Sequence, residues 1–519
     1  MNRVIFVALV GAAVLCAAPA GPAQPAPSPR ADALELLFIG GEKPARLELR
    51  AEIDGRPVPA VWDDTFAKLF AYFDRDADGA LDATEAARLP SAFALRQVLW
   101  GQSTPFSGAA PPLADIDLNG DGKASPDEVA DFYRRAGLGG VLVGAGRAPA
   151  TDALTDALLK HLDTNKDGTL TEAEVKAAPD ALKRLDANDD ELVGPGELVE
   201  RTAYPGALGS ILVTAPAPNG APDAVADALP FVVLPLRTAD RGWEAVAAAR
   251  RAAAKRPAFA GDALRGARAD APAVAWRVRF GGGKLAGGAV EAGDVKPPAS
   301  GQLVYAAGAV RLELRSDEGK LAEPVAAARK RYAAQFAEAD ADANARLDPK
   351  ELAAPKAGTL KQLAAAADRN GDGALSDTEL TAWLDLQDQI ARGHVLLTVI
   401  DHGAGLFELL DADHDGALSV RELRGAWDRL TAAGCVTDGR FDRAKLPRQL
   451  LAAISRGHPK SSPGKPARPG PAWFVAMDRN GDGDVSRREF TGPAAVFDTL
   501  DADKDGLLDA REAGAAVKK

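Results

Sequence analysis

A block of twelve residues recurs along this chain of 519 residues and limits its possible folds more than any other feature. Each block reads Asp-x-Asp/Asn-x-Asp-Gly, carries an apolar or small residue at its eighth position and ends in Glu. Seven complete copies begin at Asp74, Asp117, Asp163, Asp368, Asp411, Asp478 and Asp501. Because about 100 to 200 residues make one domain, a chain of this length predicts roughly three or four structural units.

The composition excludes a disordered chain and disfavours a protein that binds nucleic acid. Hydrophobic residues make up 46% of the chain and charged residues 26%, which is ordinary for globular proteins. There are 62 Lys and Arg against 74 Asp and Glu, and the net charge of -12 offers no general attraction to phosphate backbones. The acids fall in short clusters, which is what a hard cation requires.

The spacing within the block has a direct physical cause. Side-chain oxygens at positions 1, 3 and 5, the backbone carbonyl of position 7 and a bidentate Glu at position 12 can surround Ca²⁺ at about 2.3 to 2.6 Å. Glycine stands at position 6 because the backbone turns there with a positive φ. Asx-rich turns that bind nothing are the alternative, but seven copies that all end in Glu favour a metal-binding role.

The block resembles the calcium-binding loop of the EF-hand family, and the whole set is similar to secreted bacterial proteins with many EF-hands. Dockerin modules use a related loop but favour Asp at the last position, where every complete copy here has Glu. The resemblance implies helix–loop–helix units that pair to cover their apolar faces. An odd number of complete copies therefore predicts degenerate ones.

Three degenerate copies complete the set. The copy that starts at residue 186 keeps its oxygens but has Glu191 in place of Gly, and it is predicted to bind weakly. The copy at 434 has Lys445 in place of the final Glu, so it is predicted to be empty. The copy at 340 has its oxygens but Ala345 instead of Gly, and it supplies a partner for the copy at 368.

The predicted calcium ligands stand at positions 1, 3, 5, 7 and 12 of the complete copies and at positions 1, 3, 5 and 12 of the copy at 186. They are Asp74, Asp76, Asp78, Ala80, Glu85, Asp117, Asn119, Asp121, Lys123, Glu128, Asp163, Asn165, Asp167, Thr169, Glu174, Asp186, Asn188, Asp190, Glu197, Asp368, Asn370, Asp372, Ala374, Glu379, Asp411, Asp413, Asp415, Ala417, Glu422, Asp478, Asn480, Asp482, Asp484, Glu489, Asp501, Asp503, Asp505, Leu507 and Glu512. Ca²⁺ is the cofactor that they predict.

The predicted fold class is mostly α with small β elements: ten helix–loop–helix units in five EF-hand pairs, plus a small α+β spacer module. The pairs are 74 with 117, 163 with 186, 340 with 368, 411 with 434 and 478 with 501, because in three of these pairs the second copy starts at the same offset from the first. RLELR recurs at 46–50 and 311–315, which indicates duplication of a strand-plus-four-hands unit. The predicted boundaries are 1–20 for a signal peptide, 21–44 for a Pro/Ala-rich linker, 45–205 for the first unit, 206–310 for the spacer module, 311–450 for the second unit, 451–472 for a linker and 473–519 for the last pair.

The segment from Met1 to Ala20 is typical of a cleaved signal peptide, since Arg3 precedes an apolar run from Val4 to Cys16 that is followed by Ala18-Pro19-Ala20. That run is too short to span a bilayer, and no later segment has about 18 consecutive apolar residues. Removing the peptide leaves Cys435 without a disulfide partner. These features predict a secreted or periplasmic protein with no membrane span.

The sequence predicts no enzyme. Among five histidines, His394 lies near Asp401 and His402, but no nucleophile motif or His-Glu-x-x-His pattern accompanies them. The segment 281–284, Gly-Gly-Gly-Lys, lacks the earlier Gly and the following Ser or Thr of a phosphate loop, so it predicts a β-turn.

The predicted function is calcium binding outside the cytoplasm, with the ions stabilising an interaction scaffold. A cell-surface or extracellular protein partner is compatible with that role, whereas a nucleic acid is not. The alternatives are a calcium sensor or buffer and, behind these, an enzyme with EF-hand appendages. A sensor of the calmodulin kind opens a Met-rich groove, whereas this chain has only Met1 and Met477.

Overall fold

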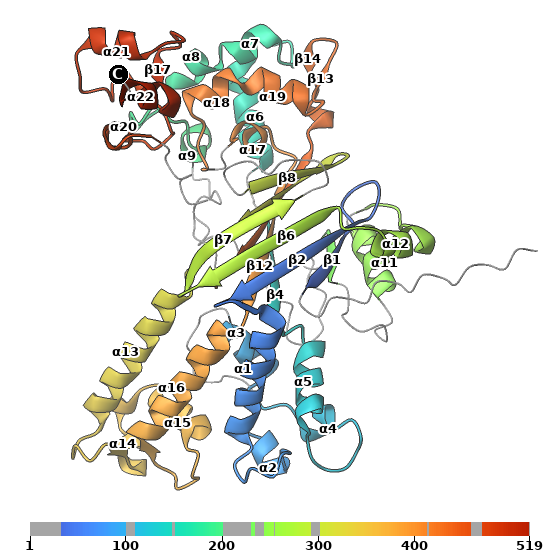
Figure 1. The fold of residues 1–519 in the computed structure, drawn as a ribbon, viewed down its shortest axis with the longest axis vertical. Coiled ribbons are helices and arrows are strands. Elements are labelled where there is room, and N and C mark those ends of the chain that lie inside the picture. Colours follow the sequence, from blue (N-terminus) through green and yellow to red (C-terminus); the bar gives the residue numbers. More distant parts are fainter. Residues whose placement is uncertain are drawn as a thin grey trace, which may run out of the picture.

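The computed structural model describes residues 33–99, 109–147, 151–200, 230–233, 243–253, 255–291, 302–412, 415–457 and 470–517. Among these residues, two large β-sheets lie at the centre of the molecule and helical lobes lie at its two ends (Figure 1). The predicted signal peptide and the candidate ligand Asp413 lie outside the described residues.

The first sheet has six strands in the described part of the chain, in the order β5-β1-β2-β6-β7 with β3 paired to β2. They are β1 (Leu34–Phe38), β2 (Ala45–Ile53), β3 (Arg56–Pro57), β5 (Phe231–Val233), β6 (Val274–Gly281) and β7 (Lys284–Glu291). β1 lies within the stretch 21–44, for which the sequence predicts a linker. β2 contains the first RLELR segment and pairs in parallel with β6, so that Leu49 faces Trp276.

The second sheet has five strands among the described residues, in the order β4-β12-β15-β9-β8. They are β4 (Val141–Arg147), β8 (Gln302–Ala307), β9 (Val310–Ser316), β12 (Val395–Gly403) and β15 (Arg448–Ser455). β9 contains the second RLELR segment and pairs in parallel with β15. β4 pairs in parallel with β12, with Leu142 opposite Leu396, although the two strands come from different halves of the chain.

Both sheets contribute to one apolar core. Phe38 and Trp276 of the first sheet belong to the same buried cluster as Leu312, Val399 and Ile454 of the second sheet. Along β6 the buried residues alternate with more exposed ones, as expected for a strand with one face in a core. Helices α11 (Trp243–Ala253) and α12 (Gly261–Ala269) form a smaller buried cluster with β1 and β5.

Lobe 1, at the lower end of Figure 1, contains the twelve-residue loops that start at 74, 117, 340 and 368. Its elements are α1 (Val58–Phe73), α2 (Ala83–Ala86), α3 (Ala92–Leu99), α4 (Leu113–Ile116), α5 (Pro126–Arg135), α13 (Ala322–Ala339), β10 (Arg346–Leu347), α14 (Pro349–Ala353), the 3₁₀ helix η2 (Pro355–Ala357), α15 (Leu360–Ala367), β11 (Leu375–Ser376) and α16 (Asp377–Arg392). Phe73, Tyr133, Tyr332 and Trp383 are buried together, so helices from both halves of the chain share this core.

Lobe 2, at the upper end, contains the loops that start at 163, 186, 411 and 434. Its elements are α6 (Thr151–Leu162), α7 (Glu172–Lys176), α8 (Ala178–Lys183), α9 (Pro195–Leu198), α17 (Leu406–Leu410), α18 (Val420–Arg424), α19 (Ala426–Ala432), β13 (Val436–Thr437), β14 (Arg440–Phe441) and the 3₁₀ helix η3 (Arg443–Lys445). Its core again joins both halves, since Leu158 and Leu182 are buried with Phe407 and Leu430.

The C-terminal pair, residues 472–517, lies beside lobe 2 (Figure 1). It consists of α20 (Ala472–Met477), β16 (Val485–Ser486), α21 (Ala494–Leu500), β17 (Leu507–Leu508) and α22 (Ala510–Val517). Phe474, Val485, Phe497 and Leu508 form a buried cluster that is separate from the core of lobe 2. The pair therefore carries its own small core.

The predicted fold class, mostly α with small β elements, is wrong. Two large sheets form the centre of the described chain, and β6, β7 and β8 from the predicted spacer module belong to them. The residue pattern of a single strand can be recognised in the sequence. However, β2 ends at Ile53 and its parallel partner β6 begins only at Val274. Such long-range parallel pairing leaves no signal in one sequence.

Two of the predicted loop pairs are also wrong. An antiparallel bridge joins Thr171 to Arg440, so loop 163 pairs with loop 434, and another bridge joins Val193 to Leu418, so loop 186 pairs with loop 411. The loops at 74 and 117, at 340 and 368, and at 478 and 501 pair as predicted.

The exchange of partners in lobe 2 follows from the second sheet. β4 and β12 are parallel neighbours, so the chain leaves both strands at the same end of the sheet. α6 follows β4 and α17 follows β12, and they begin side by side: the hydroxyl of Thr155 accepts a hydrogen bond from the backbone N–H of Leu406 at 2.9 Å. Each half therefore finds its loop partner in the other half.

Candidate metal centres

Local hydrogen bonds close each twelve-residue loop, as loop 74 illustrates. Helix α1 ends at Phe73, and the carboxylate of Asp74 then accepts the backbone N–H groups of Asp78 at 3.2 Å and Gly79 at 3.1 Å. The carboxylate of Glu85, at position 12, accepts the N–H groups of positions 2 and 9 at 2.6 and 3.1 Å. The two ends of the loop are thereby held together around its acidic side chains.

The closing Glu also starts the next helix. Asp82, at position 9, is the N-cap of α2, and Glu85 is the third residue of a capping box in which each side chain accepts the other residue's N–H. Within the described residues, the same contacts of the closing Glu recur in the other loops that end in this residue: Glu128, Glu174, Glu197, Glu351, Glu379, Glu422, Glu489 and Glu512. One residue type therefore sets both the loop and the helix that follows.

The carboxylates of these loops suit a hard cation. Carboxylate oxygens from Asp74, Asp76 and Glu85 all lie within 4.8 Å of one another, and so do those from Asp501, Asp503 and Glu512. The donors are oxygens only, which is the set that Ca²⁺ prefers and which thiolate-seeking metals do not. A bound Ca²⁺ would neutralise the negative charge of these carboxylates.

At position 7 of each complete loop, a hydrogen bond from the backbone N–H to the position-5 carboxylate orients the residue. The N–H of Ala80 donates to the carboxylate of Asp78 at 2.9 Å, and the N–H of Leu507 donates to Asp505 at 2.8 Å. The same bond occurs at Lys123, Thr169, Ala374, Ala417 and Asp484. Among the predicted ligands, the structure brings carboxylates within 4.8 Å of one another in loops 74 and 501, and Asp413 lies outside the described part.

The structure adds loop 340 to the set. Asp340, Asp342 and Glu351 have carboxylate oxygens within 4.8 Å of one another, although none of them is among the predicted ligands. Their acidic side chains are visible in the sequence, where Ala345 in place of Gly marks the copy as degenerate. Ala345 adopts a left-handed φ of 61° and still donates its N–H to Asp340 at 2.9 Å. A strained turn therefore leaves the ligand geometry intact.

A family model described as EF hand matches residues 365–384, 404–425, 472–491 and 494–512. Each stretch contains one complete loop whose closure has just been described. These four stretches are EF-hands. EF-hands imply calcium binding. The family model matches at four places, so the predicted count of ten EF-hand units in five pairs is wrong.

Comparisons with curated proteins and with solved structures found no match. In the part of the chain that the structure describes, no helix is both long enough and apolar enough to cross a membrane.

Basic side chains link several of the paired loops. Lys123, at position 7 of loop 117, lies 2.5 Å from the carboxylate of Asp78 in loop 74, and the pKa of Asp78 is lowered because it accepts this hydrogen bond. Arg440 of loop 434 contacts Asp167 of loop 163 at 2.7 Å and lowers its pKa in the same way. Each contact places a positive charge on the position-5 carboxylate of a neighbouring loop.

In the EF-hand at 478–489, burial disfavours the charged form of two carboxylates. Burial raises the pKa of Asp482 to about 7, and burial also raises the pKa of Asp484 despite its ion pair with Arg421. Carboxylates that are buried together without a balancing cation repel one another and lose hydration. This EF-hand therefore gains much from a bound cation.

Loop 434 differs from the others in its chemistry. Lys445 stands where the others have Glu, and its ammonium donates to the hydroxyl of Thr437 at 2.7 Å. Phe441 and Cys435 of this loop are buried in the core of lobe 2. The loop thus packs as a partner of loop 163 and places a cation where the others place a carboxylate.

His394 and Asp401, which are close in the sequence, do not lie together in one site. His394 precedes β12 and is fully buried, whereas Asp401 lies seven residues further along, about 23 Å for an extended strand. Asp401 binds the guanidinium of Arg448 through both of its oxygens. The segment 281–284 is the turn between β6 and β7, as predicted.

Proposed function

We propose that this chain is a non-enzymatic calcium-binding protein of the periplasm or extracellular space, in which bound Ca²⁺ stabilises a scaffold for interaction with a cell-surface or extracellular protein. Calcium binding itself follows from the EF-hands. The location, the structural role of the ions and the protein partner are the proposed part.

One observation carries the structural role: in lobe 2, loops from opposite halves of the chain are joined. Val193 of loop 186 and Leu418 of the EF-hand at 411 exchange two backbone hydrogen bonds of 3.0 Å across 225 positions (418 − 193). Because a loop of acidic residues resists folding until a cation neutralises it, ions bound at these loops would hold distant parts of the chain together. Metal binding would then contribute directly to the stability of the fold.

A calcium sensor is the second candidate, and the composition weighs against it. A sensor of the calmodulin kind exposes a Met-rich groove when it is loaded, whereas Met477 is the only methionine after the first residue. The apolar side chains of lobe 2, such as Phe407 and Leu158, are fully buried in its core. Stabilisation therefore accounts for the EF-hands better than switching does.

The location outside the cytoplasm rests on the segment from Met1 to Ala20 and on Ca²⁺ availability. The pattern of this segment is typical of a cleaved signal peptide. Extracellular EF-hand modules have dissociation constants of about 10⁻⁴ to 10⁻³ M, which suits permanent occupancy outside cells. Expression with its own N-terminus and mass measurement of the exported chain should show removal of this segment; an intact N-terminus would contradict this part.

Calorimetry tests the central claim. Purified protein should bind several Ca²⁺, and its melting temperature should rise strongly between chelator and millimolar Ca²⁺, because the ions bind the native state. Mg²⁺ at the same concentration is the matched control and should raise it less, since it demands smaller octahedral sites. Equal melting in chelator and Ca²⁺ would refute the structural role, and strong Ca²⁺-induced binding of a hydrophobic dye would favour the sensor.

A further inference from the structure

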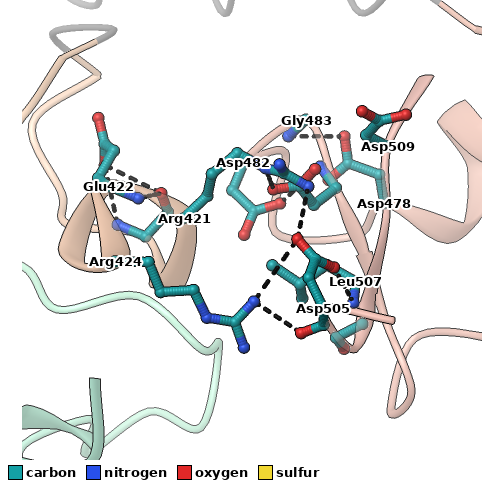
Figure 2. A network of polar contacts seen from close by, with 12 residues as sticks. Arg421, Glu422, Arg424, Asp478, Asp482, Gly483, Asp505, Leu507 and Asp509 are labelled. Atoms are coloured by element: carbon teal, nitrogen blue, oxygen red, sulfur yellow. Dashed lines mark hydrogen bonds and ion pairs between the residues drawn. The ribbon is translucent and has the colours of Figure 1, made fainter. Parts of the chain in front are cut away.

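The C-terminal pair is attached to lobe 2 through polar side chains. Arg421 and Arg424 extend from α18 to the loops of the C-terminal pair (Figure 2). Arg421 Nε donates to Asp484 Oδ2 at 2.6 Å, and Arg424 Nη1 donates to the backbone carbonyl of Asp505 at 2.7 Å. Asp505 Oδ2 also lies 3.6 and 3.7 Å from the two guanidinium groups.

In a second set of contacts, the C-terminal pair carries the positive charge and lobe 2 carries the negative charge. Arg488 of the C-terminal pair binds both carboxylate oxygens of Asp189 in loop 186, with Nη1 to Oδ1 at 2.7 Å. Its Nε lies 3.7 Å from Glu191. The two surfaces are therefore complementary in both signs, which fixes one orientation of the pair on lobe 2.

The contacts come from the metal loops themselves. Asn480 is at position 3 of its EF-hand: its amide oxygen accepts the N–H of Asp482 at 3.1 Å, and its amide nitrogen donates to the backbone carbonyl of Asp190 at 3.0 Å. Asp190 is at position 5 of loop 186. A cation that orders the oxygens of Asn480 and Asp190 would thus order a donor and an acceptor of the docking contact.

Burial of carboxylates at this junction favours a bound cation. The first Asp of each EF-hand near the junction is almost fully buried, with exposed fractions of 1% for Asp478, 3% for Asp411 and 5% for Asp501. The corresponding Asp74 and Asp163, which lie away from the junction, are only half-buried. Burying several carboxylates is costly unless opposite charge compensates them, and Arg421 and Arg424 supply positive charge to Asp484 and Asp505.

We propose that Ca²⁺ governs the docking of the C-terminal pair on lobe 2: the pair docks when its EF-hands are loaded and separates when Ca²⁺ is withdrawn. The pair can separate as a unit because its apolar residues form their own core. Coupling is reciprocal, so docking also raises the Ca²⁺ affinity of the EF-hands at 478 and 501. This inference rests on the calcium binding of the proposed function.

The test is a distance measurement between two spin labels in the full chain. Labels go on A173C in α7 and V496C in α21, two exposed positions, with Cys16 and Cys435 replaced by Ala. In saturating Ca²⁺ the distance distribution should be single and narrow, and in chelator it should become broad and longer. The same distribution in Ca²⁺ and in chelator would overturn the proposal.

Paired variants locate the cause. R421Q/R424Q should raise the free Ca²⁺ at which docking is half complete by roughly tenfold, without changing the number of bound ions. R487Q is the matched control, because Arg487 binds Asp498 inside the C-terminal pair, and it should leave docking unchanged. E489Q, in the docked EF-hand, should separate the pair at a Ca²⁺ concentration at which E85Q, in lobe 1, remains docked. Equal docking curves for R421Q/R424Q and R487Q would contradict the assigned contacts.

Calorimetry on the same samples separates the two proposals. If the labelled chain binds Ca²⁺ and the distance does not change, only the docking inference fails. If it binds no Ca²⁺, the proposed function fails and the docking inference fails with it.

Discussion

The exchanged loop pairing in lobe 2 can be tested by an engineered disulfide between Val193 and Leu418. These residues exchange both backbone hydrogen bonds of their antiparallel bridge, each 3.0 Å long. Such hydrogen-bonded pairs have Cα atoms about 5.5 Å apart, inside the range that a disulfide spans. With Cys16 and Cys435 replaced by Ala, V193C/L418C should therefore oxidise readily in saturating Ca²⁺ to a single cross-linked species.

The size of the stabilisation follows from the length of chain that is closed. The cross-link joins positions 225 apart (418 − 193), and the loss of chain entropy in the unfolded state corresponds to about 5 kcal/mol at 25 °C as an upper value. Both positions are buried, so the two substitutions also cost packing energy. Guanidinium unfolding of the oxidised and reduced forms of the same variant removes that cost from the comparison.

The matched control is L170C/V193C, which would be joined if the loops at 163 and 186 were partners. Its positions are only 23 apart (193 − 170), which corresponds to about 3 kcal/mol. Free-thiol counting and peptide mass mapping should show V193C/L418C cross-linked and L170C/V193C reduced. The opposite result would refute the exchange of loops between the two halves.

Three further predictions concern single positions. E85Q should remove one bound Ca²⁺ in titration calorimetry, whereas K445A should leave the number unchanged; a lost ion in K445A would contradict the cationic character of loop 434. A345G should raise the free energy of unfolding by about 1 kcal/mol in denaturant titrations, because Ala345 holds a φ of 61° that Gly adopts without strain. Burial lowers the pKa of His394 from 6.5 to about 3. Below pH 6.5 this histidine therefore binds a proton in the unfolded chain but stays neutral in the folded chain. Stability should fall by about 2 kcal/mol from this group between pH 6.5 and 5, and H394L should remove that part of the slope. An unchanged slope in H394L would contradict the prediction.

The local structure of the loops was readable from the sequence because its causes lie within twelve residues. Asp at position 1 accepts the N–H of position 6, Glu at position 12 accepts the N–H groups of positions 2 and 9, and position 9 caps the next helix, as Asp74, Asp82 and Glu85 show. Ala345 shows the limit of this reading. A missing Gly changes the cost of the turn, but it does not remove the carboxylates that surround the loop.

The sequence by itself determined where the loops begin and end, which oxygens they hold and where the RLELR strands run. Only the tertiary structure decided which loops are partners and that the strands of the predicted spacer complete two large sheets. The copy at 186 follows the copy at 163 at the same offset as the copy at 434 follows the copy at 411, whichever partner each one takes. The choice is made by β4 and β12, which leave the second sheet side by side, and that adjacency is a property of the folded sheet.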